Sequence, residues 1–267
     1  MVELKLKNIT LGYRKKPVVE DINFEVKPGE ILGIVGANGC GKSTIIKAIA
    51  RIIKPFSGNI LLNEINIAQI PRRDLSRLLG VVPQMPLLPS TFTAFEIVLM
   101  GRNPHLGLLQ YESKQDMAVA WEAMEKTATQ QLAERCIGQL SGGEIQSIVI
   151  ARVLAQQTKS ILLDEPTANL DIGRQIEILD LIKELCQKEN LTVVIAIHEL
   201  NLAAQYCDRL ILVNEGRIHS QGEPQVVITE ENIKQVYGSS NYLLPHPLSG
   251  LPVVLPTAFN STKELEE

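Results

Sequence analysis

Residues 36–43 read Gly-Ala-Asn-Gly-Cys-Gly-Lys-Ser and match the pattern G-x-x-x-x-G-K-[ST] of phosphate-binding loops. The stretch follows the apolar run Ile31–Val35, which is typical of a buried strand, and precedes a helix predicted over residues 42–52. A strand, a glycine-rich loop and a helix in this order are the context that the pattern requires. An ordinary glycine turn at a helix end would need neither Lys42 nor Ser43, so the sequence predicts a site for nucleotide phosphates.

The residue types of this loop suit a triphosphate and a magnesium ion. Glycines let backbone N–H groups converge on phosphate oxygens, and the helix N-terminus adds partial positive charge. Lys42 is expected to reach the β and γ phosphates, Ser43 to offer its hydroxyl to Mg²⁺, and Thr44 to donate to the α phosphate. The helix N-terminus is also expected to lower the pKa of the Cys40 thiol and make it reactive. The residues predicted to bind the nucleotide here are Gly36, Ala37, Asn38, Gly39, Cys40, Gly41, Lys42, Ser43 and Thr44.

Two carboxylates, Asp164 and Glu165, follow the apolar run Ile161–Leu163, and Pro166 then ends the predicted strand. An Asp at the C-terminal end of a strand that neighbours the strand of the phosphate loop is placed to hold magnesium, a role we expect for Asp164. Glu165, one residue later, is placed to act as a general base on a water aimed at the γ phosphate. Two carboxylates alone are commonly a solvated strand end, but beside a phosphate loop we interpret them as functional.

The composition of the 267 residues narrows the class of protein. Because 26 Lys and Arg stand against 30 Asp and Glu, and aromatic residues make up only 4%, nucleic acid is not an expected partner. The four cysteines are far apart in the sequence, which argues against a paired-cysteine zinc or redox motif. The first residues alternate as a strand does rather than as a signal peptide, and no apolar run reaches the length of a membrane-spanning helix.

Strand and helix patterns alternate along most of the chain, which predicts an α/β fold. Further strands are expected at residues 1–10, 22–26, 60–62, 80–82 and 192–197, a further helix at 172–188, and a hairpin formed by 209–213 and 217–220. Residues from about 90 to 140 show helical spacing and no strand pattern. We therefore expect a P-loop NTPase core with a mainly parallel sheet, an N-terminal antiparallel β portion and an inserted helical subdomain at about residues 90–140.

A second glycine turn, Leu140-Ser141-Gly142-Gly143-Glu144, opens a helix that is predicted to run to Ala155. Such a helix N-terminus is another place where an anion can bind. One nucleotide cannot easily occupy two glycine turns so far apart in one small domain, but two copies arranged head to tail can each lend this turn to the other's ATP. Together with the phosphate loop, the turn resembles the ATPase subunits of ABC transporters, and the resemblance covers about residues 2–238.

The resemblance implies roles for further residues. Tyr13 matches the aromatic residue that stacks on adenine, and Ser141, Gly142 and Gly143 match the residues that contact the nucleotide of a second copy. Gln84 matches the glutamine that touches Mg²⁺ or the attacking water and couples to the membrane subunit. Asp171, in the loop that begins at Asn169, matches the residue that communicates across the dimer. His198 matches the histidine that contacts the γ phosphate and orients the water, and with Glu165 and Gln84 it completes the expected catalytic set.

The resemblance also implies cofactors, partners and a location. ATP and Mg²⁺ are the expected cofactors, and the expected assembly is a homodimer bound to two transmembrane permease subunits and, through them, to a substrate-binding protein. Such a complex places the chain peripherally on the cytoplasmic face of the inner membrane. A soluble ABC ATPase acting on the ribosome or DNA is the alternative from another class, and a monomeric P-loop kinase would not need the turn at Ser141.

The segment Met100–His105 resembles the subgroup of importers for iron chelates, haem and cobalamin, although oxyanion importers such as those for molybdate can look similar. Residues 1–238 are expected to form the ATPase domain and residues 239–267 a proline-rich apolar extension. The part from Ser239 to Thr262 contains no Asp, Glu, Lys or Arg, so we expect it to pack on its own domain or on a sister subunit.

Overall fold

The computed structural model describes residues 2–107, 109–168, 170–238 and 241–256. An N-terminal antiparallel sheet has the strand order β2-β1-β4-β5. Its strands are β1 (Leu4–Tyr13), β2 (Lys16–Val26), β4 (Ser57–Leu62) and β5 (Ile65–Asn66). The expected strand at 22–26 is thus only the second half of a longer strand. A register shift and the left-handed backbone of Asp21 (φ 52°) interrupt this strand, so the apolar–polar alternation that marks residues 22–26 does not continue into its first half.

The central sheet has the order β10-β9-β3-β8-β7-β6, in which all strands but β10 are parallel. Its strands are β3 (Ile31–Gly36), β6 (Leu79–Val82), β7 (Ser160–Asp164), β8 (Thr192–Ala196), β9 (Arg209–Asn214) and β10 (Arg217–Gly222). The predicted parallel core and the hairpin are therefore confirmed. One expectation was wrong: β7 is not the neighbour of β3, because β8 lies between them.

Both faces of the central sheet are buried, which explains its continuous apolar strands. Leu32 and Ile34 face α1 (Lys42–Ile49) and the N-terminal sheet, while Ile31 and Val35 face the opposite layer. That layer contains α6 (Ile172–Glu189), α7 (Leu200–Tyr206), α8 (Pro224–Val227) and α9 (Glu230–Tyr237). α1 ends at Ile49, earlier than predicted, and the left-handed Arg51 (φ 55°) follows shortly after it.

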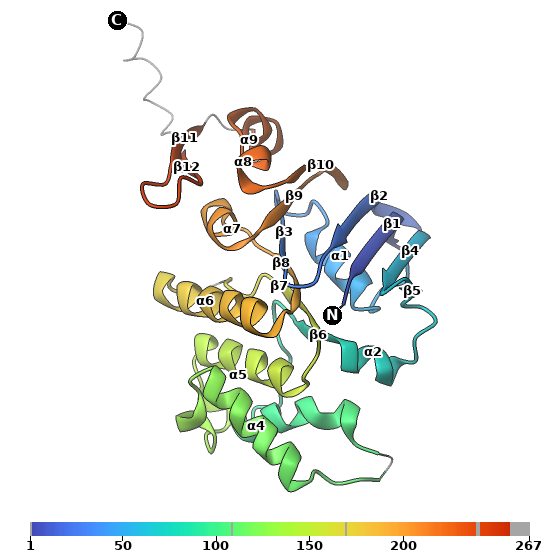
Figure 1. The fold of residues 1–267 in the computed structure, drawn as a ribbon, viewed down its shortest axis with the longest axis vertical. Coiled ribbons are helices and arrows are strands. Elements are labelled where there is room, and N and C mark those ends of the chain that lie inside the picture. Colours follow the sequence, from blue (N-terminus) through green and yellow to red (C-terminus); the bar gives the residue numbers. More distant parts are fainter. Residues whose placement is uncertain (1, 108, 169, 239–240, 257–267) are drawn as a thin grey trace, which may run out of the picture.

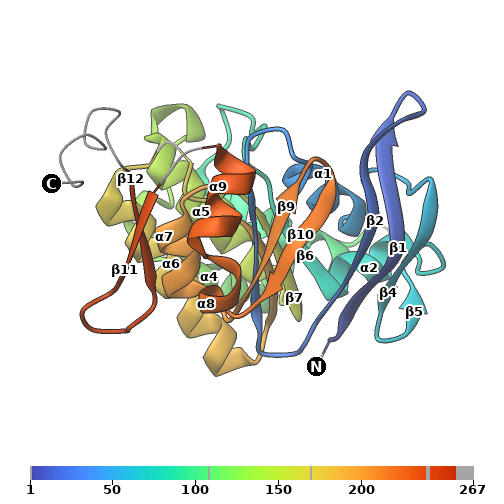
Figure 2. The same cartoon turned by 90° about the horizontal axis from the view of Figure 1, so that it is seen from above.

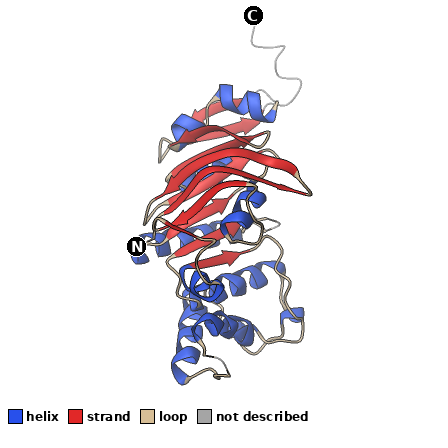
Figure 3. Cartoon of the chain, turned by 90° about the vertical axis from the view of Figure 1, so that its right-hand side faces the viewer, coloured by secondary structure: helices blue, strands red, loops and turns tan. Residues whose placement is uncertain are grey.

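A helical subdomain forms one end of the molecule (Figures 1 and 3). It contains α3 (Ala94–Leu99), η1 (Met100–His105), α4 (Lys114–Lys126), η2 (Gln130–Leu132), η3 (Ile137–Gln139) and α5 (Gly142–Ala155), and α2 (Arg72–Leu78) lies beside η1. α5 joins the two parts, since Ile148 packs in the helical cluster and Val149 in the core of the central sheet. The predicted helical insertion is thus present, and its helices extend through α5.

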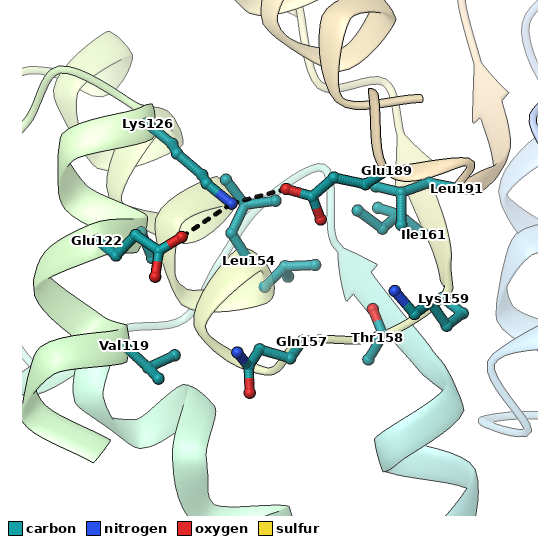
Figure 4. A pocket seen from close by; sticks show the side chains of 12 residues that line it. Val119, Glu122, Lys126, Leu154, Gln157, Thr158, Lys159, Ile161, Glu189 and Leu191 are labelled. Carbon is teal, nitrogen blue, oxygen red and sulfur yellow. Dashed lines mark hydrogen bonds and ion pairs between the residues drawn. The ribbon is translucent and has the colours of Figure 1, made fainter. Parts of the chain in front are cut away.

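An ion pair also crosses the boundary between the subdomain and the core. Lys126 at the end of α4 lies 2.6 Å from Glu189 at the end of α6 and 3.3 Å from Glu122, beside a small cavity of about 120 Å³ (Figure 4).

Among the described residues, no helix is both long and apolar enough to cross a membrane.

The C-terminal segment forms a hairpin of β11 (Asn241–Pro245) and β12 (Pro252–Pro256). The hairpin and the N-terminal sheet lie on opposite sides of the central sheet (Figure 2). Leu243 and Val254 pack against the layer that includes α7 and α9. The described part of the extension, residues 241–256, therefore packs on its own chain, while residues 239–240 and 257–267 lie outside the described residues.

Candidate functional site

The phosphate loop has backbone conformations that glycine adopts easily. Gly36, Gly39 and Gly41 have φ values of 148°, 79° and 113°. A Cβ on Gly36 would lie 2.2 Å from the carbonyl oxygen of Val213, whereas a Cβ on Gly39 would have no described heavy atom within 4 Å apart from its neighbours in the chain. The loop thus packs closely against the central sheet at Gly36 and leaves open space at Gly39, where an anion can approach the backbone.

Lys42 is almost fully buried at the start of α1, with 4% of its surface exposed. Its Nζ donates to the carbonyl oxygens of Gly36 at 2.9 Å and Ala37 at 3.3 Å, and it lies 3.9 Å from Oε1 of Glu165. A hollow of about 130 Å³ opens beside it. The hollow is lined by Val18, Asn38, Gly39, Gly41, Lys42, Ser43, Thr44 and Glu165. An ammonium group held here can interact with phosphate oxygens that enter the hollow.

Ser43 and Asp164 meet beside this hollow. The Ser43 hydroxyl donates to Oδ1 of Asp164 at 2.8 Å. Burial raises the pKa of the Asp164 carboxyl, and the Ser43 hydrogen bond and the nearby Lys47 oppose that rise. Mg²⁺ prefers oxygen ligands, so this hydroxyl and carboxylate fit a magnesium site. Although β8 separates their strands, α1 brings Ser43 across to Asp164.

Glu165 lies immediately after β7 with a left-handed backbone (φ 48°). Its N–H donates to the carbonyl oxygen of Ala196 at 3.1 Å, and its Oε2 accepts from Nε2 of Gln84 at 2.7 Å. His198 is exposed and lies two residues beyond the end of β8, the strand that pairs with β7. Five residues singled out from the sequence therefore converge here by direct contacts: Lys42, Ser43, Gln84, Asp164 and Glu165.

The expectation of a reactive Cys40 was wrong. The thiol is buried, with 7% of the residue exposed, and burial raises its pKa more strongly than the nearby Lys42 lowers it. Sγ of Cys40 faces Gly36, where a Cβ on Gly36 would lie only 2.8 Å away. Cys40 is thus a packing residue beneath the loop, not an exposed thiolate.

The turn at Ser141 belongs to a second group of candidate residues. Ser141 caps α5 in a capping box with Glu144, whose pKa is lowered by the hydrogen bonds from Ser141. Asp171 caps α6 by accepting from the N–H of Arg174 at 3.1 Å, and Arg174 and Leu170 both lie against Gly143. A Cβ placed on Gly142 would have no described heavy atom within 4 Å apart from its chain neighbours and the backbone of its own helix. The turn and the loop before α6 therefore adjoin, while Asn169 lies outside the described residues.

Tyr13 is half exposed, with 47% of its surface accessible, at the end of β1. Among the described residues, no hydrogen bond or ion pair connects Tyr13, Ser141 or Asp171 to Lys42. These residues thus stand apart from the five that converge at the phosphate loop.

Two residues at the loop were not found from the sequence. Val18 lines the hollow because β2 begins at Lys16, whereas a strand was expected only from Ile22, and the adjacent apolar pair Val18-Val19 shows no strand alternation. Tyr237 of α9 lies near the Cys40 thiol and the Gly36 amide. Burial raises the pKa of its hydroxyl to about 12, and the Gly36 amide opposes that rise. No sequence pattern indicates this contact, because it depends on how the chain returns after β10.

Comparison with known proteins identifies the family. The sequence profile described as ABC transporter matches residues 19–168. The ferric enterobactin transport ATP-binding protein FepC of Escherichia coli is 37% identical over 96% of this chain and 94% of its own length. The hemin import ATP-binding protein HmuV of Gloeobacter violaceus is 39% identical over 95% of this chain and 94% of its own length.

Solved structures agree with these relatives. A structure described as an inward-facing conformation of a metal-chelate type ABC transporter superposes with a TM-score of 0.85 at 30% identity, covering 97% of this chain and 99% of its own. The dimeric structure of the ATP-binding cassette MJ0796 bound to ADP and Pi superposes with a TM-score of 0.73 at 28% identity, covering 82% of this chain and 98% of its own. The predicted ABC ATPase fold is confirmed. The chain belongs to the ABC transporter family, as an ATP-binding subunit whose ATP hydrolysis is coupled to transport.

Proposed function

We propose that this chain is the ATPase of an importer for metal chelates of the siderophore, haem or cobalamin class, and that it works as a homodimer. The observation that supports the ATPase chemistry is that Lys42, Ser43 and Glu165 line one hollow, while Asp164 contacts Ser43 and Gln84 contacts Glu165. The cargo class is supported by the names of the relatives, which include ferric enterobactin transport and hemin import.

The residues in and around the hollow have the following proposed roles. Lys42 binds the β and γ phosphates, and Ser43 and Asp164 would hold Mg²⁺, which would neutralise charge on the transferring phosphoryl group. Glu165 removes a proton from the attacking water, while Gln84 and His198 hold that water in place. Tyr13 stacks on adenine. A second copy completes the site with Ser141, Gly142, Gly143 and Asp171.

A groove between the core and the helical subdomain supports docking of a permease. The groove has a volume of about 560 Å³, and its lining includes Arg51, Arg72 and Arg152. Burial lowers the pKa of Arg152, and Arg152 makes no ion pair with any described residue. Cationic groups in a groove fit a permease segment with acidic side chains.

β6 leads from this groove to the nucleotide site, because Leu79 and Val81 line the groove and Gln84 follows the strand. Met85 and Leu87, the residues after Gln84, are almost fully exposed and offer an apolar contact. Docking at this surface would place the chain peripherally on the cytoplasmic face of the membrane, with two permeases and a substrate-binding protein beyond them.

The substitution Glu165→Gln tests the mechanism. It keeps a side chain that can contact Gln84 but cannot take a proton, so we expect ATP binding to persist and turnover to fall by about 10² to 10⁴. Nucleotide binding and phosphate release are measured on the same preparation. Glu64→Gln is the matched control, since Glu64 pairs with Lys5 on the N-terminal sheet. Near-normal hydrolysis by the Glu165 variant would refute its role as base.

The cargo class is tested separately in vesicles that contain the full transporter. We expect MgATP to drive uptake of a labelled ferric siderophore, haem or cobalamin, and the Glu165→Gln complex to show none. Uptake of molybdate instead of any chelate would contradict the proposed class while leaving the ATPase mechanism intact.

A further inference from the structure

The C-terminal hairpin is hydrogen-bonded to the segment that carries His198. Asn201, three residues after His198, pairs with both backbone groups of Val254 in β12. The N–H of Val254 donates to Oδ1 of Asn201 at 2.7 Å, and Nδ2 of Asn201 donates to the carbonyl oxygen of Val254 at 3.2 Å. Asn201 thus occupies the edge of β12 as the backbone of another strand would.

Further contacts hold the same two elements together. The Ser249 hydroxyl donates to Oε1 of Gln205 at 3.0 Å, at the other end of α7. Leu243 and Val254 pack against the same core layer as Leu200 and Leu202, which flank Asn201. α7 is therefore attached to the hairpin at both ends and along one side.

The orientation of His198 depends on α7. Its side chain is exposed and makes no hydrogen bond with any described residue. Before His198, the last backbone hydrogen bond to the sheet is donated by the N–H of Ile197 to the carbonyl oxygen of Ile34. After His198, the next backbone hydrogen bond is accepted by the carbonyl oxygen of Glu199 from the N–H of Ala203, in the first turn of α7. The path of the chain between these points is set by where α7 sits.

From this geometry we propose that Asn201 is a positioning residue. By pairing with Val254 it fixes α7 on the C-terminal hairpin and so holds His198 in the position from which it would contact the γ phosphate. This inference rests on the proposed role of His198 in hydrolysis. It assigns a function to residues 241–256, which otherwise only cover the core.

Asn201 is suited to a test because it is exposed, so its removal leaves the two Val254 groups accessible to water rather than buried without partners. We expect Asn201→Ala to lower kcat for ATP about tenfold, within the 10² that a misplaced group can cost, and to leave the KM for ATP unchanged. Asn201→Asp keeps the acceptor for the Val254 N–H but loses the donor, so an intermediate kcat is expected.

Asn66→Ala is the matched control. Asn66 also makes two hydrogen bonds, to Asn59 and to the Ala68 N–H, but on the N-terminal sheet. The full-length chain is assayed with its permeases, and melting temperatures are measured in parallel. If Asn201→Ala melts well below the wild type, the inference is decided instead by the kcat of Asn201→Asp. That kcat is then compared with the wild-type value at a temperature where Asn201→Asp and the wild type are both folded.

The double variant separates positioning from a general loss of structure. In a His198→Ala background, Asn201→Ala should cause no further fall in kcat, because the group that it positions is absent. Three results would overturn the inference: a normal kcat for Asn201→Ala, a raised KM with unchanged kcat, or an equal fall in both backgrounds. Normal turnover by His198→Ala alone would instead show that the proposed role of His198 is wrong, and the inference with it.

Discussion

At the scale of single residues, burial controls the chemistry of the nucleotide loop. Lys42 is held under the loop by two carbonyl oxygens, and Asp164 is buried beside a hydroxyl. Phosphate oxygens can replace the two carbonyl oxygens as acceptors for Lys42, and a magnesium ion can replace the Ser43 hydroxyl hydrogen as the partner of the Asp164 carboxylate. For Cys40, burial raises the pKa of the thiol more than Lys42 and the backbone lower it, which favours the neutral thiol.

We predict that Cys40 is alkylated slowly. Because only the thiolate reacts and burial disfavours it, iodoacetamide at pH 7.5 should modify Cys40 more slowly than the partly exposed Cys136. Peptide mass spectrometry of time points measures both rates, and MgATP should slow the Cys40 reaction further by closing the loop. Equal rates in the folded protein would contradict this, and unfolded protein, in which the rates should converge, is the control.

At the scale of elements, η1 is a junction between the subdomain and the core. Arg102 is buried, and its Nε donates to Asp116 of α4 at 2.9 Å while Nη1 donates to the carbonyl oxygen of Ala155 at 2.8 Å. The carbonyl oxygen of Pro104 accepts from Arg73 and Arg77 of α2. The segment that the sequence links to a cargo subgroup therefore connects three helices.

We predict that Asp116→Ala destabilises the protein by about 3 kcal/mol, because it breaks the buried ion pair with Arg102. This value is at the low end for a buried pair, since Arg102 keeps its hydrogen bond to the carbonyl oxygen of Ala155. Hydrogen bonds from Ser113, and then Arg102, lower the pKa of Asp116 from 3.8 to about 2. A lowered pKa means that this stabilisation is full above pH 3.8 and is lost as the pH falls through about 2.

Urea unfolding measured at pH 7 and from pH 4 down to pH 2 checks both statements. The difference in unfolding free energy between wild type and Asp116→Ala should shrink across the acid range. A constant difference would show that the charge of Asp116 contributes nothing. Asp74→Ala is the control, because its contact with Arg77 is exposed.

The sequence predicts elements well where the pattern is local. The apolar run at Ile31–Val35 and the glycines after it fix a strand, a loop and a helix, and the structure has all three. The order of strands is a matter of long-range packing, so the insertion of β8 between β3 and β7 could not be predicted. The exposed fraction of Cys40 and the attachment of Val254 to Asn201 also depend on segments far apart in the chain.

At the scale of the whole molecule, the candidate residues fall into two groups. Lys42 and Glu165 belong to the group at the phosphate loop, and Ser141 and Asp171 to the group where α5 and α6 begin. No hydrogen bond or ion pair of the described chain joins them. In the proposed homodimer, two copies arranged head to tail pair these two groups, and the related cassette MJ0796 has a dimeric structure.

This arrangement predicts that two serines with the same helix-capping role differ in their effect on dimer formation. Ser141 and Ser113 each cap a helix in a capping box, with Glu144 and Asp116. Either serine replaced by alanine should lose about 0.5–2 kcal/mol of stability. Only Ser141→Ala should weaken the dimer that Glu165→Gln forms with MgATP, because in the proposed homodimer Ser141, and not Ser113, reaches the nucleotide of the second copy.

Sedimentation of the Glu165→Gln protein with MgATP, with and without each serine substitution, measures the dimer directly, and thermal unfolding shows whether the two losses of stability match. We expect Ser113→Ala to sediment as the parent dimer and Ser141→Ala to shift toward the monomer at the same concentration. An equal loss of dimer in both variants would trace the effect to helix stability, and a parent protein that stays monomeric both alone and with its permeases would contradict pairing of the half-sites.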